Sequence, residues 1–254
     1  MMKFIKFYIL SNAYYKRFQN LFNRHSIIKL IKNPIKWISK NNYELKILLR
    51  YSVFYLFINP KLKLIDREIE GMSLPMKQGR ILYNYARKLP KNSTIVEIGA
   101  YLGRSTCFIA EGIKNKKINF YSIDNFEYQF FIKNQYKPHY KNGYQYRNEF
   151  YKNVYRYRNK IKIIKGFSYN VVNDFQNEKI DMFWLDASHR YEACKRDIED
   201  WLPLVNIDGY LIFHDYSENS GNICVKKAVD EKIREGKLKK IKRIDNLLIT
   251  KKIA

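Results

Sequence analysis

Glycine and proline are scarce in this chain of 254 residues, which has only 10 and 6 of them. Such low numbers exclude collagen-like and Gly/Pro-rich low-complexity proteins. The chain is 46% hydrophobic and contains 22 Tyr and 16 Phe, which argues against global disorder. At about 150 residues per domain, the length predicts one to two domains, with enough chain to bury a core.

Cysteine is also rare, and the three present lie far apart without a CxxC pair: Cys107, Cys194 and Cys224. This spacing excludes a cysteine zinc site and argues against a disulfide framework. The longest apolar run, residues 47–58, contains Arg50 and is too short to span a bilayer. Residues 1–10 are too short for a secretory signal. We therefore expect a cytoplasmic protein without a transmembrane helix.

Acidic residues are outnumbered two to one, with 24 Asp and Glu against 48 Lys and Arg, a net charge of +24. Such a chain is attracted to phosphates, nucleic acid or anionic membrane surfaces. The excess is spread over the whole chain without a compact basic block. We therefore favour a compositional origin, of the kind that an A+T-rich genome produces.

Residues 1–66 form a zone of their own, with 13 Lys and Arg against Glu44 and Asp66, a net charge of +11. Isoleucines recur at near-helical spacing over residues 27–38 with lysines between them, and Pro34 is expected to bend or interrupt this helix. A basic amphipathic helix binds an anionic membrane peripherally, or it packs on the main domain as an extension. Both alternatives stay open, and we place the domain boundary between residues 66 and 67.

From residue 67 onward, strand and helix patterns alternate. The expected strands are 94–98, 119–123, 161–165, 180–185, 209–213, 238–244 and 247–250, and the expected helices are 82–89, 104–114, 191–201 and 225–233. This order predicts an α/β protein with a doubly wound, mostly parallel seven-stranded sheet. The last two strands are joined tightly at Asp245-Asn246 and predict a hairpin with one antiparallel strand.

Acidic residues stand at or near the ends of four expected strands: Glu97, Asp124, Asp186 and Asp215. In open α/β sheets, ligands bind outside the carboxyl ends of the strands. Chance could place one or two acidic residues at such an edge, but four are harder to explain in this way. We therefore predict a ligand site there.

The segment from Val96 to Thr106 has the pattern of a strand that is followed by two glycines and by the start of a helix. Because glycine has no side chain, the backbone of such a turn can approach a ligand closely. We expect Ser105 and Thr106 to cap the helix, and Asp124 to accept hydrogen bonds from ribose hydroxyls. This pattern is typical of a site for a nucleoside-containing cofactor. The glycines are spaced G-x-x-x-G, so the dinucleotide fingerprint G-x-G-x-x-G is absent.

The motifs come in a familiar order over about residues 67–252. They are Ile69-Glu-Gly-Met, Ile95-Val-Glu-Ile-Gly-Ala-Tyr-Leu-Gly-Arg-Ser-Thr, Leu185-Asp-Ala-Ser-His-Arg-Tyr-Glu, Asp200-Trp-Leu-Pro-Leu and Gly209-Tyr-Leu-Ile-Phe-His-Asp-Tyr. Together they resemble a bacterial family of class I S-adenosylmethionine-dependent methyltransferases, which have a Rossmann-like fold. Members of this family often accompany glycan and natural-product biosynthesis.

The resemblance implies roles for the matching residues around S-adenosylmethionine. Glu97 would lie near the methionine amino group, Asp124 would hold the ribose, and Ser168, after the third strand, would contact the adenine. Asp186 would accept a hydrogen bond from the cofactor or the substrate. The cofactor turn would be shaped by Gly99, Tyr101, Gly103 and Ser105.

Asp186-x-x-His189 is also similar to the arrangement in catechol O-methyltransferase, where the catalytic base lies three residues after the first Asp. This implies His189 as the general base beside Asp186, because a histidine pKa suits proton transfer near neutrality. Such enzymes bind Mg²⁺ through this Asp and through oxygen groups after strand five, which implies Asp186 and Asp215 as metal ligands. Tyr216 departs from that pattern, since an Asp or Asn is expected there. The alternatives are a metal-free Asp186 and hydrogen-bonded loop histidines at His189 and His214.

The stretch from residue 126 to 160 is longer than a typical crossover and carries eight Lys and Arg interleaved with eight Tyr. Aromatic and basic groups together can stack on sugars or bases and attract phosphates. We expect either a substrate lid or a helix followed by a surface loop.

The function predicted from these patterns is S-adenosylmethionine-dependent O-methylation of a hydroxylated small molecule or saccharide, such as a glycan precursor. One alternative is an RNA or other nucleic-acid methyltransferase, which the charge permits. Against it, the fourth strand ends in Leu-Asp-Ala-Ser and lacks the Pro-Pro-aromatic loop of base amino-methyltransferases. Another alternative is a non-catalytic basic protein that binds glycans or membranes on the same fold.

Overall fold

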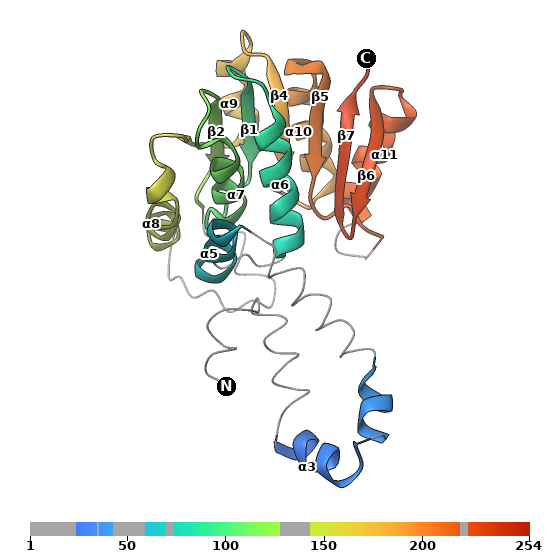
Figure 1. Ribbon diagram of the computed structural model, residues 1–254. Coiled ribbons are helices and arrows are strands. Elements are labelled where there is room, and N and C mark those ends of the chain that lie inside the picture. Colours follow the sequence, from blue (N-terminus) through green and yellow to red (C-terminus); the bar gives the residue numbers. More distant parts are fainter. Residues whose placement is uncertain (1–23, 35, 43–58, 70–73, 128–142, 219–222) are drawn as a thin grey trace. The chain divides into compact units, whose positions relative to one another are not determined.

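A computed structural model of the chain describes residues 24–34, 36–42, 59–69, 74–127, 143–218 and 223–254 (Figure 1). The chain divides into two compact units, Met1–Glu70 and Gly71–Ala254. The larger unit contains every strand of the described chain.

Two helices in the described part of the first unit begin at an Asn-Pro pair. Helix α3, Arg24–Lys32, ends before Asn33, and Pro34 and residues 36–42 are helical again. Asn33 Oδ1 accepts the Lys36 backbone N–H at 3.0 Å, so proline and cap interrupt the helix at the place predicted. Helix α5, Pro60–Glu68, begins in the same way with Asn59.

The predicted membrane contact of residues 1–66 falls largely on segments outside the described residues. Among the helices that the structure describes, none combines the length and the apolar character needed to cross a bilayer.

The second unit is built on one sheet of seven strands. The strands are β1 Thr94–Ile98, β2 Asn119–Asp124, β3 Lys162–Lys165, β4 Ile180–Leu185, β5 Val205–Phe213, β6 Leu238–Ile244 and β7 Leu247–Lys252. They lie in the order β3-β2-β1-β4-β5-β7-β6; β7 pairs antiparallel with both β5 and β6, and all other pairs are parallel. The predicted doubly wound, mostly parallel sheet is confirmed, as is the C-terminal hairpin.

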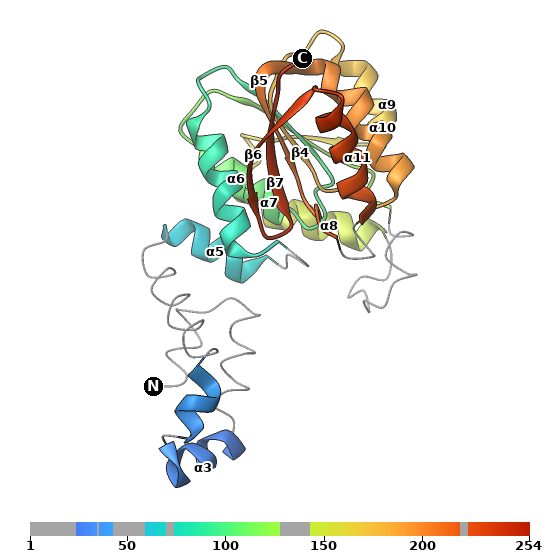
Figure 2. The same cartoon turned by 90° about the vertical axis from the view of Figure 1, so that its right-hand side faces the viewer.

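Helices cover both faces of the sheet (Figure 2). They are α6 Met76–Lys88, α7 Arg104–Ile113, α8 Gly143–Val154, α9 Ser168–Val171, α10 Tyr191–Trp201 and α11 Ile223–Arg234. Helices α6 and α7 lie on one face, and α9, α10 and α11 lie on the other. The central strand β1 is therefore buried along its whole length, including its one acidic side chain, Glu97.

Strand β5 differs from the sequence expectation, whereas the long stretch after β2 contains a helix, as one of the two alternatives expected. Strand β5 begins at Val205 instead of Gly209, and Asp208 adopts a positive φ of 64° beside a shift in the β4–β5 register. The sequence Asn-x-Asp-Gly is typical of a turn, but here it forms a bulge within a continuous strand. In the long stretch after β2, residues 143–154 form helix α8, whereas residues 128–142 lie outside the described residues.

The sheet order reverses between β1 and β4, because β2 and β3 follow on one side and β5 on the other. At such a switch point the connecting helices leave toward opposite faces, which opens a crevice at the carboxyl ends. The residues predicted for the site follow β1, β2, β4 and β5, around this point.

Candidate active site

The turn after β1 is held by two glycines that no other residue can replace without strain. Gly99 has a φ of +86°, and a Cβ there would lie 2.1 Å from the Asp186 carbonyl oxygen. Gly103 has a φ of +84°, and its Cβ would meet Val154 of α8 at 2.6 Å. The two positions let this turn pack directly on the loop after β4 and on α8.

Glu97 lies fully buried beneath this turn and accepts three hydroxyl hydrogen bonds. Ser105 Oγ donates to Oε1 at 2.5 Å, while the hydroxyls of Thr106 and Ser122 both donate to Oε2 at 2.7 Å. The expectation that Ser105 and Thr106 cap α7 is wrong, because Gly103 is the N-cap and makes no side-chain bond. Both hydroxyls lie within the first helical turn and point to the buried carboxyl instead.

Burial raises the pKa of Glu97 to about 7, although the three hydroxyl donors favour the charged form. The folded protein therefore retains a proton that the unfolded chain releases near the ordinary value of 4.5. This contribution to stability is present at low pH and is lost as the pH rises through about 7.

We expect wild type to lose thermal stability relative to Glu97→Gln between about pH 5 and pH 8, since the glutamine has no proton to lose. Melting temperatures of both proteins across this range test the expectation. Parallel pH profiles would show that Glu97 does not titrate there.

Asp124, at the end of β2, binds the backbone of the same turn. Its Oδ2 accepts the N–H groups of Ala100 and Tyr101 at 2.9 and 3.0 Å, and its Oδ1 accepts the Phe126 N–H at 2.7 Å. The hydroxyl of Tyr146 on α8 reaches Oδ2 at 3.2 Å. Oδ2 thus accepts three hydrogen bonds and Oδ1 accepts the one from Phe126, so Oδ1 keeps a lone pair for a ligand hydroxyl.

Aromatic side chains surround Asp124. The ring of Tyr146 lies 5.6 Å from that of Tyr101 and 5.7 Å from that of Phe126. Tyr101 and Phe126 have positive φ values of 48° and 52°. Left-handed backbone at non-glycine residues costs free energy and collects at functional sites, which fits a ligand site beside Asp124.

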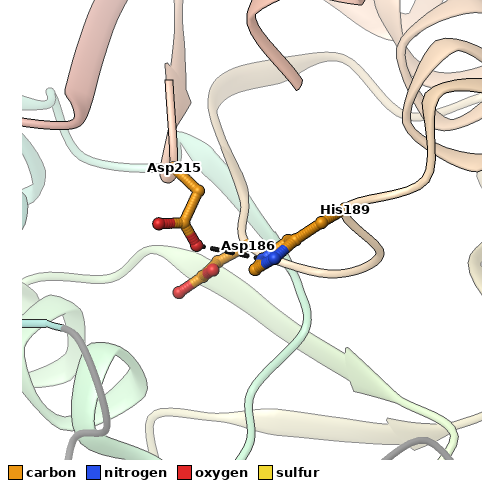
Figure 3. Close-up of side chains that lie close together, drawn as sticks. All are labelled: Asp186, His189 and Asp215. Carbon is orange, nitrogen blue, oxygen red and sulfur yellow. Dashed lines mark ion pairs between the residues drawn. The ribbon is translucent and has the colours of Figure 1, made fainter. Parts of the chain in front are cut away.

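A second group of side chains, Asp186, His189 and Asp215, converges from the ends of β4 and β5 (Figure 3). His189 Nε2 lies 2.9 Å from Asp215 Oδ2, while 45% of the histidine side chain remains exposed. The hydrogen bond to Asp215 raises the pKa of His189, against the opposing effect of burial. Asp215 itself is nearly buried, and its two histidine partners hold its pKa well below the ordinary value despite that burial.

The buried side chain of His214 contacts both carboxylates, those of Asp186 and Asp215. Its Nδ1 lies 3.2 Å from both Asp186 Oδ1 and Asp215 Oδ2, and its side chain is 1% exposed. Burial alone lowers the pKa of His214, but the two carboxylates outweigh it and raise the pKa to about 10.

Two of these side chains, His214 and Asp215, are held by distant parts of the chain that give no local signal in the sequence. Gln78 on α6 lies with Oε1 3.0 Å from His214 Nε2, and its amide nitrogen donates to Asn246 Oδ1 at 2.6 Å. Asn246, in the β6–β7 turn, donates to Asp215 Oδ1 at 2.8 Å. Sequence reasoning identified neither residue, because only the tertiary fold brings them together.

Ser168, predicted to contact adenine, begins α9 directly after the β3 loop. Its hydroxyl donates to Asp197 of α10 in a short hydrogen bond. The predicted role of Ser168 stays a prediction, as do those of the other cofactor residues.

The sequence from residue 96 to residue 216 matches the family model described as a methyltransferase domain. This part of the chain is similar to methyltransferase domains. The matched span runs from β1 to the residue after Asp215, so it contains both groups of side chains described above. No curated protein matches the sequence.

Solved methyltransferases share the fold of this domain at low sequence identity. An O-methyltransferase from Bacillus cereus in complex with SAH aligns with a TM-score of 0.54 and 12% identity over 77% of this chain and 91% of its own. The O-methyltransferase TomG from Streptomyces achromogenes, which is involved in tomaymycin synthesis and was solved with SAM, aligns with a TM-score of 0.56 and 12% identity. That alignment covers 80% of this chain and 95% of TomG.

Proposed function

We propose that this methyltransferase uses S-adenosylmethionine to methylate a hydroxyl group of a small molecule or saccharide. The observation that carries the proposal is the His189–Asp215 pair, with a 2.9 Å contact and an exposed imidazole, at the ends of β4 and β5. Such a pair provides a base for an acceptor hydroxyl, which must lose its proton as the methyl group is transferred.

The residues around the β1 turn fit this cofactor. Asp124 Oδ1 has capacity for a ribose hydroxyl, and Glu97 places a carboxyl beneath the turn for the methionine end. When bound, S-adenosylmethionine supplies an electrophilic methyl group. The chain's own task is to orient the acceptor and to remove its proton.

In the proposed mechanism, His189 donates its Nε2–H to Asp215, which fixes the tautomer of the imidazole. The unprotonated Nδ1 then removes the proton from the hydroxyl group of the substrate. The carboxylate also stabilises the imidazolium that results. Asp186, 24% exposed at the same edge, is available to position the acceptor through a hydrogen bond.

This mechanism requires a neutral His189, which predicts a pH dependence. Because Asp215 raises the pKa of His189 above 6.5, turnover should rise with pH through that raised value and level off above it. In Asp215→Asn the pKa of His189 falls, so the acidic limb should move to lower pH while the plateau rate also falls. Rates measured across pH for both proteins test this, and an acidic limb that does not move would contradict the pairing.

The acceptor class can be tested directly. The protein is incubated with S-adenosylmethionine and, separately, with catechol-type phenols, free sugars and nucleotide-activated sugars, and S-adenosylhomocysteine is measured. A hydroxyl acceptor that raises product formation, and is recovered as its methyl ether, supports the proposal. Methylation of RNA oligonucleotides alone would favour the nucleic-acid alternative, for which the net charge of +24 is the supporting feature.

A further inference from the structure

We propose that part of the first unit binds the surface of an anionic membrane peripherally. This part comprises helix α3, Arg24–Lys32, and the helical residues 36–42 that follow it, both blue in Figure 1. We call these two helices the basic helix pair. The binding surface lies within the first unit and is independent of the proposed methyl transfer.

Three isoleucines of the basic helix pair are exposed to solvent. The exposed fractions are 43% for Ile28, 75% for Ile31 and 50% for Ile38. A single exposed isoleucine needs no explanation, but these three all lie between residues 28 and 38. Ile31 is also the most exposed large apolar side chain in the described part of the chain. Such a group of side chains indicates a surface that an apolar partner covers.

Trp37 is the apolar side chain that the basic helix pair buries between its own helices. It is 6% exposed, and its indole Nε1 donates to Ser26 Oγ of α3 at 2.7 Å. Asn33 caps the second helix through its side chain, and the Trp37 bond connects that helix to α3. The exposed isoleucines therefore stand outside a pair of helices that already has its own internal contact.

Basic side chains lie next to the exposed isoleucines. Ile28 and Ile31 are three residues apart and so form one row along the side of α3. Lys29 and Lys32 form a second row in the same way, and at 3.6 residues per turn this row is adjacent to the first. The second helix adds two more lysines, so that four are exposed in all: Lys29, Lys32, Lys36 and Lys40.

The positive charge of the basic helix pair has no acidic counterpart close by in the sequence. Residues 24–42 contain Arg24 and the four lysines but no Asp or Glu. Lysines of the second unit differ, since Lys226 pairs with Asp230 at 2.7 Å and Lys251 pairs with Asp208 at 3.1 Å. A cationic surface without local compensation attracts an anionic partner.

Adjacent rows of isoleucine and lysine favour an anionic membrane over nucleic acid. At a membrane surface, apolar side chains enter the boundary between headgroups and acyl chains, while lysines stay with the anionic headgroups. Nucleic acid attracts lysines through its phosphates, but its bases are bound by stacking on aromatic rings and not by aliphatic side chains. Helix α3 has nine residues, against about 20 in a membrane-spanning helix, so the contact is at the surface.

The test is co-sedimentation of the full chain with lipid vesicles at about 0.1 M salt. The vesicles contain phosphatidylcholine alone or with about 30 mol% phosphatidylglycerol. Wild type should bind the anionic vesicles at least about tenfold more tightly than the neutral ones. Ile28→Ser/Ile31→Ser should weaken binding to the anionic vesicles at least about tenfold. Glutamine at the four exposed lysines should have an effect of similar size.

Matched controls carry the same kinds of substitution in the second unit. Ile207→Ser/Ile241→Ser removes two isoleucines that are 59% and 44% exposed. The charge control places glutamine at four exposed lysines, namely Lys91, Lys117, Lys239 and Lys242. Both controls should bind anionic vesicles within about twofold of wild type, because their side chains lie outside the proposed contact.

Wild type that binds neither kind of vesicle would overturn the proposal, as would an isoleucine variant that binds like its control. Equal losses in the two lysine variants would also overturn it, because the attraction would then come from the charge of the whole chain. A single-stranded RNA oligonucleotide is measured in parallel, and RNA binding without vesicle binding would assign the lysines to nucleic acid instead. Circular dichroism verifies folding, and Ile31→Ser alone takes the place of the double variant if that variant does not fold.

Discussion

Replacing His189 by alanine should lower turnover by about 10²- to 10⁴-fold, the usual contribution of a positioned general base. The affinity for S-adenosylhomocysteine should stay nearly unchanged, because His189 contacts Asp215 and lies apart from the β1 turn in the hydrogen-bond network. Because the side chain is 45% exposed, its truncation removes little packing. Methyl-transfer rates, measured with whichever substrate the screen described above identifies, and calorimetric titrations of the variant test both statements.

The matched control is Glu192→Ala, a truncation of an exposed side chain three residues further along. It should leave both turnover and cofactor affinity near the wild-type values. If His189→Ala and Glu192→Ala have equal rates, His189 is not the base. If His189→Ala also loses cofactor affinity, its effect comes from a disturbed loop.

The second large effect is expected at Asp124, where alanine should weaken cofactor binding by about 10- to 100-fold. This range corresponds to losing one hydrogen bond between a charged group and a ribose hydroxyl, about 1.5–3 kcal/mol. Removing the carboxylate also releases the N–H groups of Ala100 and Tyr101, which form the turn itself. The loss should therefore lie at the upper end of the range.

The more conservative Asp124→Asn separates these two causes, because its amide oxygen can still accept backbone N–H groups. We expect it to bind more tightly than Asp124→Ala and less tightly than wild type. Asp174→Ala, which truncates an exposed aspartate, serves as the surface control. Unaltered affinity in Asp124→Ala would remove Asp124 from the cofactor site.

Much of the fold follows from local patterns. Strands β1, β4 and β6 have the predicted bounds: β1 and β4 are mostly apolar, and β6 ends at the tight turn of the hairpin. The bulge at Asp208 was missed, since the same residues also read as a turn. The acidic residues at strand ends were found because strand ends in a parallel sheet converge by topology.

The detailed chemistry of the site does not follow from local patterns. Ser105 has the sequence signature of a helix cap, yet it donates to Glu97, because a buried carboxyl needs donors more than the helix start does. His214 has no signature in the sequence that shows its contacts with Asp186 and Asp215. Its ring is held by Gln78, 136 residues before it, and Asp215 is held by Asn246 at the hairpin turn.

The most direct test of the account is calorimetric titration of the full chain with S-adenosylmethionine and S-adenosylhomocysteine, with NAD as the control ligand, in the presence and absence of Mg²⁺. The account predicts saturable binding of both sulfur nucleosides and no binding of NAD, and tighter binding with Mg²⁺ would indicate an ion at Asp186 and Asp215. A folded protein that binds neither sulfur nucleoside would contradict the proposed methyl transfer.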